Sequence, residues 1–125
     1  MSTWNARTLE RIAAAEELHI APRRGDGTLR EATTIWVVRD GDDLYVRSWR
    51  GTTGSWWNTA QDSHTGHIAA GGAEADVTFA AVGDPAVNDR VDAAYRAKYG
   101  RYTSYVEPMV ADRARATTLR LTPQQ

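Results

Sequence analysis

The chain has 125 residues, a formal net charge of −1 and no cysteine. The lack of cysteine excludes disulfides and thiolate-ligated metal, and the small net charge gives no general attraction to nucleic acid or to a membrane. No apolar run is long enough to span a membrane and the N-terminus lacks the apolar core of a signal peptide, so we expect a cytoplasmic protein that forms a single domain, residues 1–125.

The first predicted elements are a helix and a short strand. Residues 3–18 carry apolar side chains at helical spacing, and Ser2 or Thr3 is available as a cap. Residues 19–23 predict a strand. Because proline has no N–H to donate, Pro22 favours a position at the edge of a sheet.

A hairpin is predicted next. Residues 33–38 are β-branched and aromatic, Asp40-Gly41 is typical of a tight turn, and residues 44–49 alternate strictly. Successive side chains of a strand point to opposite faces, so one face of this strand is aliphatic and the other carries Tyr45, Arg47 and Trp49. We expect the second face to be open, so that replacing Arg47 would leave the stability of the fold unchanged.

A loop of glycines and hydroxyl side chains, residues 50–55, follows the hairpin and runs into Trp56 and Trp57. Its hydroxyls and backbone N–H groups, the following helix N-terminus and the nearby arginines favour anion binding, and Ser55 is expected to cap the helix. No dinucleotide or nucleoside-triphosphate motif is present, so the pattern indicates no particular phosphate ligand. A plain connection between a strand and a helix, with solvated arginines, is the alternative.

Three more strands are predicted after this loop. Residues 65–70 and 75–82 alternate on either side of a Gly71-Gly72 turn, and residues 117–122 alternate at the C-terminal end. The total is about six or seven strands joined mostly by short turns. This pattern predicts a small antiparallel, barrel-like sheet in an α+β fold.

One long helix is predicted between these strands, over residues 84–99. It begins at Asp84-Pro85, a capping residue followed by proline at the first helical position, and Gly100 ends it. Residues 101–115 predict a loop with one or two short helical turns around Pro108.

The aromatic residues suggest contacts with a planar ligand. Trp49, Trp56 and Trp57 can stack on a flat ring, but adjacent residues of a helix point about 100° apart, so we expect only one of the neighbouring tryptophans to face a pocket. Tyr102 and Tyr105 are three residues apart and can offer phenolic donors to a substrate, or they can form a dimer seam.

The remaining polar residues do not predict a metal site or a hydrolase. His64, His67 and Asp62 lie close together in the sequence, but they have no further ligand at recognisable spacing, so we expect no metal. No Ser-His-Asp arrangement and no paired-carboxylate spacing is present.

A family resemblance rests on the segments IWVVR, DDLYVRS and AAYRAKYGRY. With these segments the whole chain resembles the bacterial family catalogued as domain of unknown function 2255. The hydrophobic strand, the Asp-Gly turn, the small-residue loop and WWNTA resemble, more distantly, the split β-barrel proteins that bind flavin or deazaflavin. These include proteins similar to pyridoxamine-phosphate oxidase and to deazaflavin-dependent reductases.

The distant resemblance implies a phosphate cofactor, flavin mononucleotide or a deazaflavin, held by the strand, the loop and the following helix. The residues implied for the cofactor are Arg47, Ser48, Trp49, Arg50, Thr52, Thr53, Ser55, Trp56 and Trp57. The substrate is expected near Tyr102 and Tyr105, and a homodimer is implied because such barrels place the cofactor at a subunit seam.

Three functions remain open at this point. The chain is expected to be a small-molecule oxidoreductase that leaves hydride chemistry to its cofactor. The alternatives are a non-catalytic barrel that binds a small ligand, and a cofactor-free cyclase or isomerase.

Overall fold

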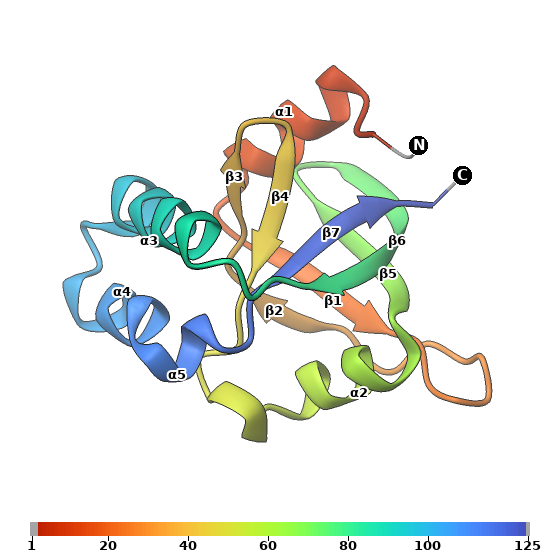
Figure 1. The fold of residues 1–125 in the computed structure, drawn as a ribbon. Coiled ribbons are helices and arrows are strands. Elements are labelled where there is room, and N and C mark those ends of the chain that lie inside the picture. Colours follow the sequence, from red (N-terminus) through yellow and green to blue (C-terminus); the bar gives the residue numbers. More distant parts are fainter. Residues whose placement is uncertain (1–2, 125) are drawn as a thin grey trace.

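The computed structural model describes residues 3–124 and contains a seven-stranded antiparallel sheet, ordered β2-β1-β5-β6-β7-β4-β3, curled into a half-barrel (Figure 1). The α+β barrel predicted from the sequence is confirmed. The strands are β1 (Leu18–Pro22), β2 (Thr33–Ile35), β3 (Val38–Asp40), β4 (Asp43–Val46), β5 (Thr65–Ala70), β6 (Ala73–Ala81) and β7 (Leu119–Pro123). The helices are α1 (Ala6–Ala14), η1 (Gly51–Thr53), α2 (Ser55–Ser63), α3 (Pro85–Tyr99), α4 (Thr103–Val110) and α5 (Asp112–Arg115).

The curl of the sheet follows from how β2 connects to β3. These strands lie at opposite edges of the sheet, yet only Trp36 and Val37 separate them in the chain. The two edges must therefore lie close together. The single strand predicted over residues 33–38 is divided here because β2 pairs with β1 whereas β3 pairs with β4.

We call the Trp36-Val37 connection between β2 and β3 the barrel crossing. Side chains at the end of α3 form hydrogen bonds with its peptide groups. The buried Val37 N–H donates to the Tyr99 hydroxyl at 3.3 Å, and the Val37 carbonyl accepts from Lys98 Nζ at 2.7 Å. The Tyr99 hydroxyl in turn donates to the carbonyl of Glu16 at 2.6 Å. A buried peptide that has left the sheet needs such partners, so α3 fixes the place where the barrel closes.

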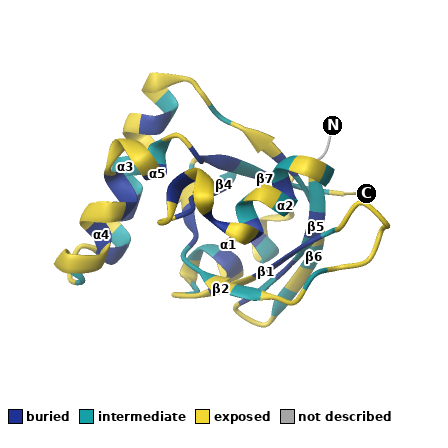
Figure 2. Cartoon of the chain, turned by 90° about the horizontal axis from the view of Figure 1, so that it is seen from below, coloured by how far each residue is buried: buried dark blue, intermediate teal, exposed yellow. Residues whose placement is uncertain are grey.

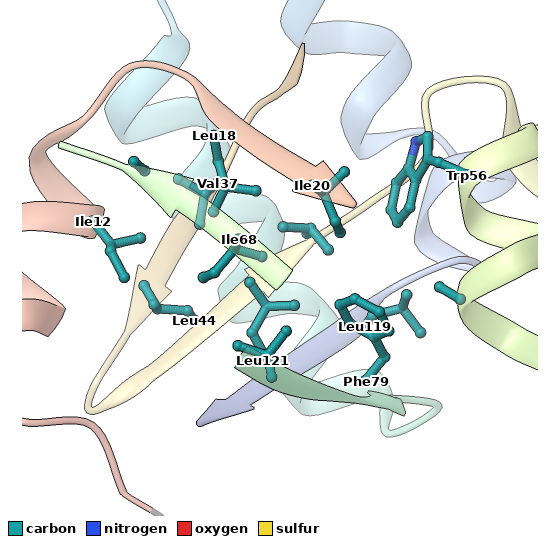
Figure 3. Packing of buried hydrophobic residues seen from close by; sticks show 14 of the residues in the cluster. Ile12, Leu18, Ile20, Val37, Leu44, Trp56, Ile68, Phe79, Leu119 and Leu121 are labelled. Atoms are coloured by element: carbon teal, nitrogen blue, oxygen red, sulfur yellow. The ribbon is translucent and has the colours of Figure 1, made fainter. Parts of the chain in front are cut away.

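The main hydrophobic core fills the inside of the curled sheet. Figure 3 shows side chains from α1, β1, β4, β5, β6, β7 and α2 converging there. The Trp4 indole donates to the carbonyl of Leu121 at 3.0 Å and secures the N-terminal segment against β7. The largest core side chains are Leu9, Ile12, Leu18, Ile20, Leu44, Trp56, Ile68, Phe79, Leu119 and Leu121.

A second core lies on the outer face of β3 and β4, under α3 and α4. Its buried members are Val38, Tyr45, Val91, Tyr95, Tyr99, Val106, Met109 and Val110. Figure 2 shows that α3 and α4 each have buried and exposed sides. The expectation that the Tyr45 and Arg47 face of β4 is open is therefore wrong, because this helical layer covers it.

Two N-terminal predictions also need correction. Helix α1 covers Ala6–Ala14 rather than residues 3–18, because Asn5 caps it by accepting from Arg7 N at 3.0 Å. The alternative cap Ser2 lies outside the described residues. Strand β1 is not an edge strand, since it pairs with both β2 and β5, and Pro22 is tolerated because it is the last residue, beyond the stretch that pairs with β2.

The turns and helix boundaries with strong local sequence preferences agree with the predictions. Gly71 and Gly72 have φ of 59° and 80° in the turn between β5 and β6, a region that favours glycine. Asp84 caps α3 by accepting from Ala86 N at 2.9 Å, and Gly100 follows its last residue. The segment 101–115 is more helical than predicted, because it forms both α4 and α5.

Candidate functional site

An aromatic cleft opens between β2, the segment after β4, helix α2 and helix α4. Its volume is about 550 Å³. Four aromatic side chains, from Trp36, Trp49, Trp56 and Tyr105, contribute to its wall. The other lining residues are Thr34, Ile35, Arg47, Ser104, Pro108 and Met109. We refer to this hollow as the aromatic cleft.

Two of the four rings are held firmly by the fold. Trp36 stacks on Tyr99 with ring centroids 3.9 Å apart and planes 4° from parallel, so the barrel crossing orients it. Trp56 is 6% exposed and belongs to the main core (Figure 3). The inner part of the cleft is therefore preformed.

The other two rings lie at the rim. Trp49 is 59% exposed and Tyr105 is 70% exposed, which makes them the most exposed large aromatic side chains in the described part of the chain. Exposed aromatic surface beside a hollow is typical of a binding site rather than of a packing surface. These rings have apolar area left for a ligand or a partner to cover.

The adjacent tryptophans point in different directions, as predicted. Trp56 faces the cleft, whereas the Trp57 indole donates to the carbonyl of Thr117 at 3.0 Å and ties α2 to the start of β7. Trp57 therefore anchors the helix. The sequence did not indicate that both Trp49 and Trp56 reach the same cleft.

Arg47 lies inside the protein, and all five of its N–H donors have protein acceptors. Nε donates to Thr118 Oγ1 at 2.9 Å, and Nη1 donates to Asp92 Oδ1 at 2.5 Å and to the Met109 carbonyl at 2.9 Å. Nη2 donates to the Asn88 carbonyl at 3.1 Å and to Asn88 Oδ1 at 3.0 Å. A guanidinium has only five donors, so none is left for a phosphate. Arg47 lines the cleft, but its guanidinium is fully hydrogen-bonded to other groups of the protein.

Further polar residues extend this network beyond Arg47 and join two helices, α3 and α5, to the sheet. Asp92 also accepts from Arg115 Nη1, and Arg115 pairs with Asp89 at 3.0 Å. The Thr118 hydroxyl donates to Asn88 Oδ1 at 2.6 Å. We call the set Arg47, Asn88, Asp92, Arg115 and Thr118 the arginine cluster. It fixes α3 and α5 against β4 and β7.

The sequence contained an indication of this cluster that the prediction missed. Asn88 and Asp92 are four residues apart on α3, next to Val91 and Tyr95, which mark its packed face. Two polar residues beside a packed helical stripe require buried partners. Arg47, on a strand with one aliphatic face, is such a partner.

The glycine-rich loop has a rigid internal structure. Gly51, with φ of 64°, begins the short η1 turn, and the Thr53 hydroxyl donates to the Arg50 carbonyl at 2.8 Å. Arg113 Nη2 donates to the same carbonyl at 3.1 Å. The Thr53 hydroxyl, which was predicted to hold a phosphate, is therefore hydrogen-bonded within the loop. Thr52 is exposed, and its carbonyl accepts a hydrogen bond from Asn58 Nδ2 at 2.9 Å.

Arg50 and Ser55 differ from each other in their surroundings. The Arg50 guanidinium lies 5.1 Å from the centre of the exposed Trp49 ring, at the rim of the cleft. Ser55 is the first residue of α2, and Gly54 occupies the cap position with no side-chain hydrogen bond, so the expected capping by Ser55 is wrong. The Ser55 hydroxyl accepts from Arg30 Nη2 at 3.3 Å instead. Ser48 is buried, with its N–H donated to Thr117 Oγ1.

The two tyrosines assigned to the substrate do not share a surface. Tyr105 lies at the rim of the cleft, but the Tyr102 hydroxyl donates to the carboxylate of Glu16. That hydrogen bond, with help from Arg101, lowers the pKa of Glu16. Tyr102 therefore connects the corner between α3 and α4 to the segment before β1.

Lys98, the single lysine of the chain, is half-buried at the barrel crossing. Burial lowers its pKa to about 8, although the charge of Glu16 acts in the opposite direction. Its amine donates to the Val37 carbonyl and does not line the cleft.

None of the three histidines lines the aromatic cleft. His67 on β5 sits between Asp76 at 3.0 Å and Glu74 at 2.9 Å, and hydrogen bonds to these carboxylates raise its pKa. His19 pairs with the Thr34 hydroxyl, and His64 ends α2. Within residues 3–124, no three acidic or histidine side chains are placed to hold a metal ion, and no helix is long and apolar enough to cross a membrane.

Solved structures with the same fold support the split-barrel description. HutZ, the heme storage protein from Vibrio cholerae, is 13% identical, covers 100% of this chain and 92% of its own, and gives a TM-score of 0.72. A putative pyridoxamine 5'-phosphate oxidase from Listeria innocua is 12% identical, with coverages of 96% and 93% and a TM-score of 0.65. A FAD-binding protein from Mesorhizobium loti is 15% identical, with coverages of 98% and 92% and a TM-score of 0.60.

At these identities the likeness establishes the fold alone. No curated protein matches the chain significantly. A family model does match, over residues 8–121, and that range includes every residue that lines the aromatic cleft. The chain belongs to the family described as an uncharacterized protein conserved in bacteria, DUF2255.

Proposed function

We propose that the protein binds the planar ring of a flavin-type cofactor in the aromatic cleft and acts as a small-molecule oxidoreductase. The observation that carries this proposal is the convergence of Trp36, Trp49, Trp56 and Tyr105 on one hollow of about 550 Å³. That volume suits a drug-sized ligand, and offset or edge contacts with aromatic rings stabilise a flat ligand by about 0.5–1.5 kcal/mol each.

The residues of the cleft fit the ring better than they fit a phosphate. The walls are mainly aromatic and aliphatic, with Met109 and Ile35 beside the four rings. Arg47 has no free donor, and Arg50 is an exposed rim residue. When bound, a flavin or deazaflavin ring supplies the capacity for hydride transfer. The chain itself supplies stacking surface, orientation and partial exclusion of water.

The names of the structural relatives bear on the class of ligand. Among the structural relatives, the Mesorhizobium loti protein is named as FAD-binding, whereas HutZ is named for heme storage. We favour the flavin-type ligand because the walls of the cleft offer several aromatic faces to a flat ring. We also propose a homodimer, in which a second copy covers the rim rings Trp49 and Tyr105.

A non-catalytic ligand-binding barrel is the second candidate. It is favoured by one observation: apart from the Tyr105 phenol, the polar residues that line the cleft are Thr34, Ser104 and Arg47, and none of these three is a free acid or base. An enzyme with this cleft would have to leave proton transfer to that phenol, the cofactor, the substrate or water.

The test is a titration of the protein with flavin mononucleotide and with a deazaflavin, followed by tryptophan fluorescence. Trp49→Ala and Tyr105→Ala should each weaken binding about fivefold, the equivalent of about 1 kcal/mol. Leu29→Ala is the matched control, because Leu29 is an exposed apolar residue that does not line the cleft. Failure of both ligands to bind, or an equal loss of binding affinity in all three variants, would overturn the proposal. Reduction of the bound ligand by a hydride donor then separates the oxidoreductase from the non-catalytic barrel.

A further inference from the structure

The barrel crossing joins the aromatic cleft to further aromatic rings behind its wall. Trp36 lines the cleft and also stacks on Tyr99, with ring centroids 3.9 Å apart. The centre of the Tyr102 ring lies 5.9 Å from that of Trp36, and the two planes are tilted by 34°. Neither tyrosine lines the cleft itself. Electron-rich rings in contact therefore extend from the cleft wall to the residue that precedes α4.

The two tyrosines differ in where their hydroxyl protons can go. The Tyr99 hydroxyl donates to the peptide carbonyl of Glu16 at 2.6 Å, which is a very weak base, and burial raises the pKa of Tyr99. The Tyr102 hydroxyl donates to the carboxylate of Glu16, which can accept a proton. The Glu16 side chain is 49% exposed, so it can pass that proton on to water.

Cations lie against both phenol rings and strengthen this difference. The Arg101 guanidinium is 4.6 Å from the centre of the Tyr102 ring, and Lys98 Nζ is 5.1 Å from the centre of the Tyr99 ring. A positive charge at this distance disfavours a second one on the ring. An oxidised phenol at either place must therefore lose its proton, and of the two only Tyr102 has a carboxylate to take it.

We propose that Trp36, Tyr102 and Glu16 form a redox relay that carries an oxidising equivalent out of the aromatic cleft. This inference rests on the proposed flavin-type ligand, whose photoexcited ring is the one-electron oxidant. Trp36 gives one electron to that ring. Tyr102 then gives one electron to Trp36, while its O–H bond breaks and the proton forms a new O–H bond with Glu16 Oε1. The products are a ring reduced by one electron, a neutral radical at Tyr102 and a protonated Glu16.

The Tyr105 phenol is the competing end point within the cleft. It is 70% exposed, and within residues 3–124 no hydrogen bond joins its hydroxyl to a carboxylate. Water is a weaker base than a carboxylate that already accepts a hydrogen bond from the phenol. The radical should therefore form at Tyr102, and Tyr105→Phe is the matched control for Tyr102→Phe.

The experiment is electron paramagnetic resonance of the protein loaded with flavin mononucleotide and illuminated with blue light. A cobalt(III) ammine complex in solution takes the electron from the reduced ring, and ring-deuterated tyrosine distinguishes a tyrosyl signal from a tryptophan signal. The wild type should show a tyrosyl radical. Tyr102→Phe should remove it, whereas Tyr105→Phe should leave it unchanged. Glu16→Gln keeps an acceptor oxygen but not the base, and should lower the yield about tenfold.

The affinity for flavin mononucleotide separates the relay from a structural role. Tyr102 and Glu16 do not line the cleft, so Tyr102→Phe and Glu16→Gln should bind the ligand as the wild type does. A loss of affinity that accounts for the loss of signal would contradict the relay. Binding without a tyrosyl radical, a radical that persists in Tyr102→Phe, or one that is lost in Tyr105→Phe would overturn the inference and leave the proposed function standing. Failure of flavin mononucleotide to bind would overturn both.

Discussion

The arginine cluster and the aromatic cleft lie on either side of the same short stretch of chain, and they differ in how completely their groups are satisfied. Arg47 is 1% exposed and has five hydrogen bonds, whereas Trp49, two residues later, is 59% exposed and lies against the guanidinium of the exposed Arg50. A buried charge is tolerated only when its donors are paired, so the cluster serves the fold. The unsatisfied surface is aromatic, and that is where a ligand is expected.

The largest effect should come from breaking the arginine cluster. Arg47→Ala removes the guanidinium donors to the Asn88 and Met109 carbonyls and to Thr118 Oγ1, and one of the two partners of Asp92. We expect the free energy of unfolding to fall by about 3–5 kcal/mol, as measured by urea denaturation. Arg50→Ala is the matched control and should change it by about 0.5 kcal/mol or less. Equal stability of the two variants would show that Arg47 is not a structural residue.

A smaller effect is expected from the hydroxyl that supports one wall of the cleft. Tyr99→Phe removes the acceptor for the Val37 N–H and the donor to the Glu16 carbonyl, at the crossing that also positions Trp36. We expect a loss of about 1–3 kcal/mol, because a buried peptide group loses its partner. Tyr105→Phe deletes an exposed hydroxyl and should have no measurable effect on thermal unfolding. A Tyr99→Phe variant as stable as the wild type would mean that the crossing does not depend on this contact.

The amine of Lys98 contrasts with Arg47, because its direct partner is a carbonyl rather than a carboxylate. Burial lowers the pKa of Lys98 from 10.5 to about 8. Between these values the unfolded chain binds more protons than the folded protein, so stability should rise with pH over this window. The free energy of unfolding of the wild type, relative to that of Lys98→Met, should therefore increase from pH 8 to 10.5. We expect an increase of roughly 1 kcal/mol, because the amine is only half-buried. A difference between the two proteins that stays constant with pH would show that the pKa of Lys98 is not lowered by folding.

The smallest effect should come from His67 on β5, which does not line the cleft. Hydrogen bonds to Asp76 and Glu74 raise its pKa, so its stabilisation is complete below the unfolded pKa, about 6.5, and is lost as the pH rises through the higher folded value. His67→Gln should lower stability at pH 5 by about 0.5–1 kcal/mol and have less effect at pH 8. His64→Gln is the control, since no carboxylate of the described chain pairs with it. A larger effect at pH 8 would contradict this account.

The sequence alone was sufficient to predict the elements that depend on the preferences of neighbouring residues. Gly71-Gly72 specifies a turn and Asp84-Pro85 specifies a helix start through the backbone conformations that these residues favour. Alternation located β4 and showed that its two faces differ. These features need no knowledge of distant segments, and they account for the correct fold class.

The errors arose where distant segments decide the outcome. Alternation around Arg47 does not reveal that α3 and α4, which begin only at Pro85 and Thr103, cover that face. Trp36 and Ser104 escaped notice as cleft residues because they become neighbours only when β2 crosses the barrel and α4 packs beside it. The aromatic residues Trp49 and Trp56 were found because their chemistry is unusual wherever they lie.

Nuclear magnetic resonance of the five tryptophan indole N–H groups during a riboflavin titration tests the central claim most directly. Trp36, Trp49 and Trp56 line the cleft, whereas Trp4 and Trp57 donate their indole N–H groups to carbonyls elsewhere. The account predicts that the three cleft resonances, assigned through single Trp→Phe variants, shift strongly while the other two move little. Unchanged cleft resonances, or larger shifts at Trp4 and Trp57, would show that the aromatic cleft is not where the ring binds.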